Sequence, residues 1–331
     1  MAAPAAGAIG SLGSLLAGAR RADAAWTCTV PENNPHGPSK LGFHVVGGNP
    51  LESYIQQLRD NGTYFKLIKC VDDFGAAWCA KRLTPKTVTV GRMCGPEHFH
   101  DYGDPLREAK EKMKSMAEIW SRNRDVIDYW EVMNESDPRN TAGHRRLGEF
   151  YMKCMEIAER TGYKLAIFSY SVGVPEWEEF EALVKLGVFE MAKAGGHILS
   201  LHEYNWGSQC KYWGGALPGQ PSYPDRGART GRYRWWYRDF LIPENQVVPL
   251  VITEAGYDGI LAQPDDGDWN WRDHYMDGGG VGLPWMDDRM REDDYVIGNA
   301  LFTAGNWNDA YDYGPTELQT ITNYVISMKN A

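Results

Sequence analysis

The sequence predicts an α/β fold, a single (β/α)8 TIM barrel with long loops on the face where its strands end. From Leu41 onward, short apolar strand patterns alternate with amphipathic helical patterns. Residues 41–331 divide into eight such units of roughly 36 residues, which suits a barrel of about 250 residues with insertions. A doubly wound sheet is the alternative, but Gly47-Gly48-Asn49 does not match the glycine-rich first turn that such sheets carry.

The N-terminal segment, residues 1–40, is predicted to lie outside the barrel, which occupies residues 41–331. Residues 2–25 are rich in Ala, Gly and Ser, and Ala22-Asp23-Ala24 resembles a cleavage site. No positive charge precedes the weakly apolar stretch, so an export signal and a disordered leader both stay open. A secreted or cell-surface location is favoured over a cytoplasmic one.

Each strand is predicted from a short apolar or β-branched run, and each helix from apolar residues at helical spacing. The expected strands are 41–46, 64–71, 87–90, 126–135, 165–169, 198–204, 247–254 and 306–310. The expected helices are 50–61, 74–83, 106–120, 147–161, 177–194, 233–241, 295–302 and 316–328.

The composition bears on partners and cofactors. The formal net charge is −10, and nucleic-acid binding requires a basic footprint that neutralises phosphates, so we expect no nucleic-acid partner. No apolar stretch reaches the ~20 residues that span a bilayer. The six cysteines contain no CxxC pair, which argues against a zinc ribbon, and we expect neither a metal nor a cofactor. The 13 Trp and 18 Tyr residues suit sugar faces and core packing equally well.

Two of the predicted strands end in glutamate, at the face of a barrel where chemistry collects. Glu135 ends strand four and Glu254 ends strand seven, so both are expected at the same level of the barrel. Alternation along strand seven places Ile252 and Glu254 on one face, and the apolar member indicates that this face points into the barrel. Two carboxylates that face each other across a pocket are what glycoside hydrolysis requires.

These strand ends resemble those of the clan A glycoside hydrolases, the retaining (β/α)8 enzymes whose two glutamates end strands four and seven. The resemblance is carried by Trp-Glu-Val-Met-Asn-Glu at 130–135, His-x-Tyr at 202–204, Thr-Glu-Ala-Gly at 253–256, and Trp307 on strand eight. It implies that Glu135 is the general acid/base and that Glu254 is the nucleophile.

The resemblance also implies roles for the neighbouring side chains. Asn134 would hydrogen-bond the 2-hydroxyl of the sugar, Tyr204 would hold Glu254 in place, and His202 would line the same pocket. Trp307 would form the floor of the subsite that holds the reacting sugar.

Two strand ends depart from the cellulase-like pattern of the clan. Strand two carries Lys69-Cys70-Val71-Asp72 where an Arg is expected, and strand three carries Gly91-Arg92-Met93 where a His is common. Arg92 could keep Glu254 ionised, because a nearby guanidinium lowers the pKa of a carboxyl group. A salt bridge at the barrel rim is the alternative for Arg92, and the family within the clan is left open.

Long loops follow strands six and seven on the predicted catalytic face, over 205–234 and 256–294. Loops of this length in a compact domain are usually functional. We hypothesise that some of their rings stack on sugars away from the cleavage point, and the alternative is that they pack the loops onto the barrel. The candidate rings are Trp206, Trp213, Trp269 and Trp271.

The sequence therefore predicts an O-glycosyl hydrolase, a retaining β-glycosidase or endo-glycanase that cleaves β-linked oligo- or polysaccharides by double displacement. Its two carboxyl groups should lie about 5–5.5 Å apart. The alternative is a non-catalytic glycan-binding or scaffold protein on a glycosidase-like barrel. An oxidoreductase or aldolase barrel is a weaker rival, since no phosphate-binding glycine turn and no convincing strand-end lysine support it. The sugar, the linkage and the oligomeric state are left open.

Overall fold

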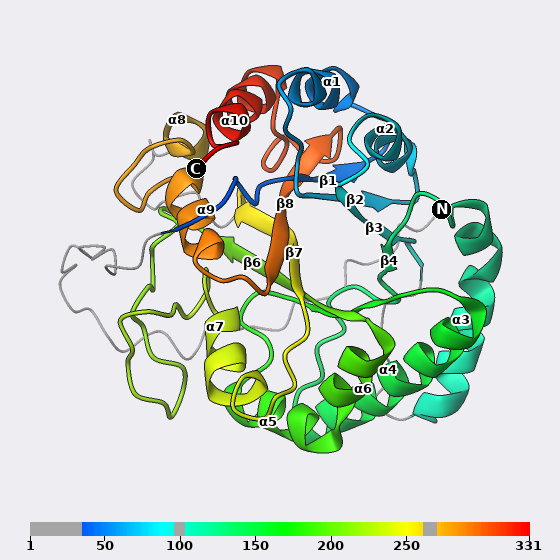
Figure 1. Cartoon of the computed structure of the whole chain (residues 1–331). Coiled ribbons are helices and arrows are strands. Elements are labelled where there is room, and N and C mark those ends of the chain that lie inside the picture. The colour runs from blue at the N-terminus through cyan, green and yellow to red at the C-terminus, as the bar shows by residue number, and fades with distance from the viewer. Residues whose placement is uncertain (1–34, 96–102, 261–269) are drawn as a thin grey trace, which may run out of the picture.

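A computed structural model describes residues 35–95, 103–260 and 270–331, and these residues form one sheet of eight parallel strands (Figure 1). Its strands are β1 (Phe43–Val46), β2 (Leu67–Val71), β3 (Val88–Arg92), β4 (Tyr129–Trp130), β5 (Ala166–Tyr170), β6 (Ile198–Asn205), β7 (Leu250–Tyr257) and β8 (Val296–Gly305). The strand order is β4-β3-β2-β1-β8-β7-β6-β5, with every pairing parallel. A parallel bridge between Trp130 and Leu165 joins the two edge strands and nearly closes the ring. The predicted single (β/α)8 barrel is confirmed.

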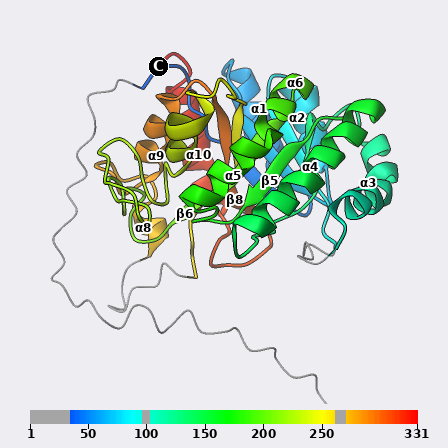
Figure 2. The same ribbon diagram turned by 90° about the horizontal axis from the view of Figure 1, so that it is seen from below.

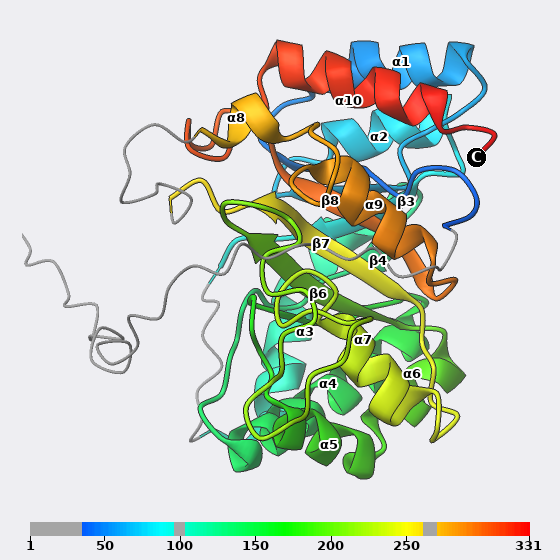
Figure 3. The same cartoon turned by 90° about the vertical axis from the view of Figure 1, so that its left-hand side faces the viewer.

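Helices surround this barrel and alternate with its strands (Figure 1). They are α1 (Glu52–Asp60), α2 (Gly75–Leu83), α3 (Pro105–Arg122), α4 (Thr141–Thr161), α5 (Trp177–Leu186), α6 (Val188–Gly195), α7 (Tyr233–Trp236) with the π-helical turn η1 (Tyr237–Leu241), α8 (Trp271–His274), α9 (Leu283–Arg291) and α10 (Pro315–Ser327). The last helix lies beside the first (Figure 3), where Gln57 and Gln319 hydrogen-bond at 2.8 Å. Helices α3 and α4 also pack side by side (Figure 2).

Local signals set several helix ends. Helix α3 begins at Asp104, whose side chain accepts the backbone N–H groups of Leu106 and Arg107, and Pro105 occupies the first helical position. Helix α4 ends at Gly162, which has a φ of 76°, a left-handed conformation that glycine adopts without strain. No helix among the described residues is long and apolar enough to span a bilayer.

The barrel interior is layered: it is apolar toward the N-terminal ends of the strands and polar toward their C-terminal ends. A small buried cluster fills the lower interior and consists of Leu67, Val90, Ala166, Ile198, Val251 and Ala300. Two residues further along their strands, on the same faces, Lys69, Ser200 and Thr253 follow Leu67, Ile198 and Val251. This second layer is polar and fully buried, so the change from hydrocarbon to charge occurs in the middle of the barrel.

The predictions for residues 295–310 were wrong, although the helix predicted over 316–328 is present as α10. Residues 295–302 were predicted as a helix and 306–310 as a strand, but the structure forms strand β8 over Val296–Gly305 and places 306–310 in the loop after it. The run is apolar without a clear period, and periodicity alone does not separate a buried strand from a buried helix. The strand requires a residue without a side chain at Gly298, because a Cβ added there would lie 3.0 Å from the Lys40 carbonyl oxygen.

The bounds of strand four also differ from the expectation. This strand was predicted over 126–135, but β4 covers only Tyr129–Trp130, and the Glu131 N–H beyond it still donates to the Gly91 carbonyl oxygen at 2.9 Å. Of the predicted leader, residues 1–34 lie outside the described residues. The last part of that segment packs against the barrel, where the Lys40 N–H donates to Asp287 at 2.7 Å.

Candidate active site

The polar layer of the barrel is organised around Lys69, a fully buried residue of β2. Its Nζ lies 2.7 Å from Oε2 of Glu131 and 3.2 Å from Oε1 of Glu254. Ser200 donates to the other oxygen of Glu131 at 2.7 Å and lies 2.7 Å from the Thr253 hydroxyl. Buried charges are tolerated when they are paired and hydrogen-bonded, and this layer satisfies both conditions.

Glu254 lies on β7 above this layer and is held from several sides. Tyr204 donates its hydroxyl to Oε2 at 2.8 Å, and Nδ1 of His44 lies 3.5 Å from Oε1. Burial alone raises the pKa of Glu254, but the electrostatic effects of His202 and Lys69 outweigh it and hold that pKa well below its usual value. Glu254 is therefore an ionised, immobilised carboxylate.

Glu131 is ionised largely through the same ammonium group. Burial alone would raise its pKa, but the charges of Lys69 and His202 and the hydrogen bonds from Lys69 and Thr253 together outweigh burial and lower the pKa of Glu131 to about 2. The imidazole of His44 behaves in the opposite way, because burial and the charge of Lys69 hold its pKa well below the usual value. His44 is thus a neutral neighbour of Glu254.

Glu135 lies in the turn after β4, where it has a φ of 45°. The left-handed region is uncommon for residues other than glycine, and such backbone conformations concentrate at functional sites. Its N–H donates to the Ser169 carbonyl oxygen at 2.9 Å, and its Oε1 lies 2.8 Å from Nδ1 of His202. Its side chain is 38% exposed, compared with 8% for Glu254, so the two carboxylates occupy unlike environments.

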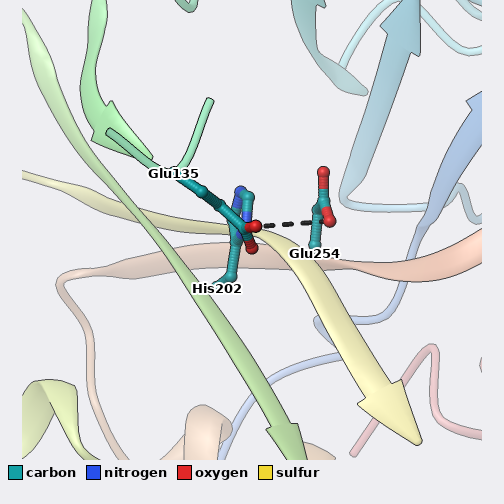
Figure 4. Close-up of side chains that lie close together, drawn as sticks. All are labelled: Glu135, His202 and Glu254. Carbon is teal, nitrogen blue, oxygen red and sulfur yellow. Dashed lines mark hydrogen bonds and ion pairs between the residues drawn. The ribbon is translucent and has the colours of Figure 1, made fainter. Parts of the chain in front are cut away.

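Glu135, His202 and Glu254 converge at the mouth of the barrel (Figure 4). One ligand atom of each lies within 4.8 Å of those of the others, so the three side chains could hold a metal ion. The ammonium group of Lys69, 3.2 Å from Glu254, already compensates the negative charge that would attract a cation. This distribution of charge favours an acid–base pair over a metal centre.

Of the other predicted residues, Arg92 and Asn134 lie close to this centre. Arg92 ends β3, is buried, and has its Nε 4.0 Å from Oε2 of Glu131. Its charge also lowers the pKa of Glu254, although burial and the effects of His202 and Lys69 are larger. The Oδ1 atom of Asn134 is buried and accepts no hydrogen bond from the described residues, as expected of a group that serves a ligand.

Trp307 does not lie on strand eight, which corrects the prediction. It follows the end of β8 in a loop and is 58% exposed. The ring of β8 that reaches the site is Phe302, whose centroid is 4.8 Å from that of His44 and 6.0 Å from that of Tyr204. Trp307 was assigned to the strand because the eighth strand was placed too late in the sequence.

The aromatic loops divide into packed and partly exposed rings. Trp213 is 7% exposed and packs edge-on against Trp285, and Trp271 is 4% exposed and stacks on Tyr257. These rings fix the loops to the barrel and leave little face for a sugar. Trp206 is only half-buried at the end of β6. The predicted candidate Trp269 lies outside the described residues.

Sequence reasoning missed Lys69, Glu131, His44 and Phe302 as site residues. A usable signal was present for three of them, because each is an ionisable residue inside a buried apolar strand or strand end, as in Leu67–Val71 or Phe43–Val46. Such a residue requires a partner and is therefore a candidate for a functional cluster.

A cavity of about 1060 Å³ opens at the ends of β1 and β8 and is not lined by these carboxylates. Its lining includes Val46 and Gly305 at the ends of β1 and β8, together with Tyr54, Arg272 and Asp309. Glu135 and Glu254 are not part of its lining. Because β1 and β8 end on the same face of the barrel as β4 and β7, the cavity offers room for parts of a substrate away from the reacting atoms.

Comparisons with known proteins give a fold-level likeness. No protein-family profile and no curated protein sequence matches the chain. Among solved structures it is similar to SrfJ from Salmonella typhimurium, with 10% identity, a TM-score of 0.41, and coverage of 81% of this chain and 65% of that chain. An endoglucanase shows 13% identity, a TM-score of 0.38, and coverage of 86% and 96%. An AP endonuclease of family 2 from Brucella melitensis shows 8% identity, a TM-score of 0.39, and coverage of 82% and 95%. The neighbours thus differ in activity, and their low identities assign none of these activities to the chain.

Proposed function

We propose that the chain is a retaining β-glycoside hydrolase related in mechanism to clan A, with Glu254 as nucleophile and Glu135 as general acid/base. The observation that carries the proposal is a pair of carboxylates in unlike surroundings, with one oxygen of Glu135 within 4.8 Å of one oxygen of Glu254. This separation suits the ~5–5.5 Å of retaining enzymes and is too short for the ~6.5–9.5 Å that an inverting pair leaves for water.

The surroundings of each carboxylate suit its proposed role. Glu254 stays ionised beside Lys69, and Tyr204 fixes the carboxylate through its second oxygen, so a nucleophilic oxygen is aimed and charged before the substrate arrives. Glu135 is partly exposed and in contact with His202, which allows it to exchange a proton with the leaving oxygen and then with water.

The reaction then proceeds in two steps. Glu254 attacks the anomeric carbon while Glu135 gives its proton to the departing glycosidic oxygen, and a glycosyl ester forms on Glu254. Glu135, now ionised, removes a proton from a water molecule that attacks the same carbon, and the ester bond to Glu254 breaks. Two inversions leave the configuration of the sugar unchanged.

Aryl β-glycosides with good leaving groups test both roles. The Glu254→Gln variant should lose turnover by several orders of magnitude, and azide should restore turnover to Glu135→Ala as a β-glycosyl azide accumulates. The control is Glu190→Gln, an exposed change on helix α6 that should leave the rates unchanged. Proton NMR of the first product should show retention at the anomeric carbon.

Other results would contradict the proposal. Full activity of Glu254→Gln, or an inverted first product, would exclude double displacement by this pair. Loss of activity on treatment with a chelator, restored by a divalent ion, would favour the metal arrangement of Glu135, His202 and Glu254. Sugar binding without turnover on any β-glycoside would favour the non-catalytic glycan-binding alternative.

A further inference from the structure

The segment after β6, from its loop into α7 and η1, carries five arginines with a consistent pattern. Four of them are neutralised by carboxylates, in the pairs Arg226–Asp239, Arg232–Glu176, Arg234–Asp293 and Arg238–Asp225. Arg229 is the exception, because no carboxylate of the described residues forms an ion pair with it. Four guanidinium groups of this segment therefore have a carboxylate partner, and the guanidinium group of Arg229 has none among the described residues; it is called the unmatched guanidinium below.

The unmatched guanidinium is held in place by aromatic rings. The central carbon of Arg229 lies 3.4 Å from the centroid of Trp206 and 5.3 Å from that of Tyr212. The ammonium group of Lys211 lies 5.6 Å from the centroids of the same two rings. Cation–π contact orients a guanidinium through its flat face, so the N–H groups at its edge stay available to an acceptor.

Burial makes this arrangement costly without a ligand. Arg229 is half-buried, and burial lowers the pKa of its guanidinium. A partly desolvated cation without a carboxylate partner loses hydration that its ring contacts restore only in part. The cost is recovered when an anion binds to it, because guanidinium and carboxylate or sulfate oxygens form short, charge-assisted pairs.

The position of this cluster connects it with the candidate active site. His202 and Tyr204 are alternate residues of β6, so they point to the same side, and Trp206 directly follows Asn205, the last residue of that strand. The side chain of Asn205 donates to the Lys211 carbonyl oxygen at 2.8 Å, which holds the loop against the end of β6.

A second connection runs through β7. Arg229 is within electrostatic range of Asp258, and Asp258 accepts a hydrogen bond from the Tyr311 hydroxyl at 3.0 Å. Tyr311 in turn packs edge-on against Tyr204, with ring centroids 6.5 Å apart, and Tyr204 donates to Glu254. The unmatched guanidinium therefore lies at the rim of the same mouth that holds the two carboxylates.

We propose that Arg229, mounted on Trp206 and Tyr212, recognises an acidic substituent, a carboxylate or a sulfate, on a sugar of the substrate close to the cleaved bond. This inference rests on the proposed function where it takes the bound sugar to be part of a substrate, but the binding site itself does not require turnover. The net charge of −10 disfavours a densely charged polyanion, so the inference is restricted to glycans with isolated acidic sugars.

The test compares matched glycans on the full chain. Oligosaccharides with a β-linked glucuronate, the same oligosaccharides after reduction of the carboxyl group to a neutral alcohol, and a sulfated neutral counterpart are titrated calorimetrically into the Glu254→Gln variant. We expect an affinity about 10- to 100-fold higher for an acidic form than for the neutral form, as befits one charge-assisted pair. Whether glucuronate or the sulfated sugar is preferred distinguishes the two sources of negative charge.

Variants then assign the preference to its residue. Adding Arg229→Gln should abolish the preference for acidic glycans, and Arg229→Lys, which keeps the charge but loses the planar fork, should retain part of it. The matched control is Arg124→Gln, since Arg124 also lies over a ring, that of Tyr163 at 4.6 Å, but next to helix α4 rather than in the loop after β6. It should leave the preference intact.

Two outcomes separate this inference from the proposed function. Equal affinity for acidic and neutral glycans, or a preference that persists in a folded Arg229→Gln variant, would overturn the inference while leaving hydrolysis of neutral β-glycosides possible. An acid preference that depends on Arg229, combined with no hydrolysis by the unmodified chain, would support the site and overturn the enzymatic proposal.

Discussion

A single ammonium group, that of Lys69, lies between the carboxylates of Glu131 and Glu254 and contacts both. Removing it would leave two buried carboxylates without the cation that lies closest to both. At the scale of the residue, the charge state of the proposed nucleophile therefore depends on a neighbour that the sequence places on another strand, 185 positions away.

The Lys69→Met variant should show this dependence in its pH profile. Loss of a contacting positive charge raises a carboxyl pKa by ~1–3 units, so the acid limb of kcat/KM should move to higher pH. Lys81→Met serves as the control, because Lys81 also pairs with a carboxylate, Asp128 at 2.5 Å, but outside the candidate site. Identical acid limbs for Lys69→Met and the unmodified chain would contradict the assigned role.

The element scale shows how two short strands hold the layer of charge in position. Strands β3 and β4 pair through Gly91 and Trp130, and they carry Arg92 and Glu131 immediately afterwards. Trp130 is fully buried and stacks on Trp120 with centroids 5.0 Å apart. A Cβ on Gly91 would lie 2.7 Å from the Trp130 ring, so this pairing requires a glycine.

The Gly91→Ala variant should therefore be destabilised. Because the indole is fixed by its own packing, we expect a loss of about 1–3 kcal/mol in the free energy of unfolding. Urea denaturation measures it, with Gly278→Ala as the matched control, since nothing lies within 4 Å of the Cβ added there. Equal stability of the two variants would show that the ring moves aside freely.

The sequence predicted those elements whose signals are local. Strand β7 is a β-branched run that contains Glu254, and helix α4 has both an apolar stripe and a terminal glycine. The prediction of strand β8 failed because its apolar run has no period that separates a strand from a helix. The pairing of Lys69 with Glu131 and Glu254 was not accessible, because it depends on the register of β2 against distant strands.

The site could be predicted in its carboxylates but not in its support. Glu135 and Glu254 follow from strand ends, whereas the contact of Phe302 with His44 and Tyr204 follows only from closing the ring between β8 and β1. Arg229, unlike the arginines near it, forms no ion pair with a carboxylate of the described residues, and only the folded structure shows this difference.

At the scale of the whole molecule, the buried charge layer makes stability depend on pH. The pKa of Glu131 is lowered from 4.5 to about 2 on folding. A lowered carboxyl pKa contributes stability that is fully present above the unfolded pKa and is lost as pH falls toward the folded pKa. This contribution is roughly 3 kcal/mol at neutral pH, and Glu254 adds to it with the same sign.

Unfolding experiments at several pH values measure this contribution. The unmodified chain should be more stable than Glu131→Gln at pH 7, and the difference should shrink steadily between about pH 4.5 and pH 2. A difference that stays constant across that range would show that the carboxylate contributes through packing rather than through charge.

The seam of the barrel, where the edge strands β4 and β5 meet, should open more readily than the other strand pairs. Among the described residues, β4 and β5 meet through the bridge from Trp130 to Leu165 and, further on, through the N–H of Glu135 bonded to Ser169. Glu254, by contrast, lies on β7, which is paired along much of its length with β6 and β8. Backbone amides at the seam should exchange with deuterium sooner than those of β6 and β7, because fewer bonds must open. The proposed proton donor would then be mounted on the part of the ring that opens most readily, and the proposed nucleophile on its stiffest wall.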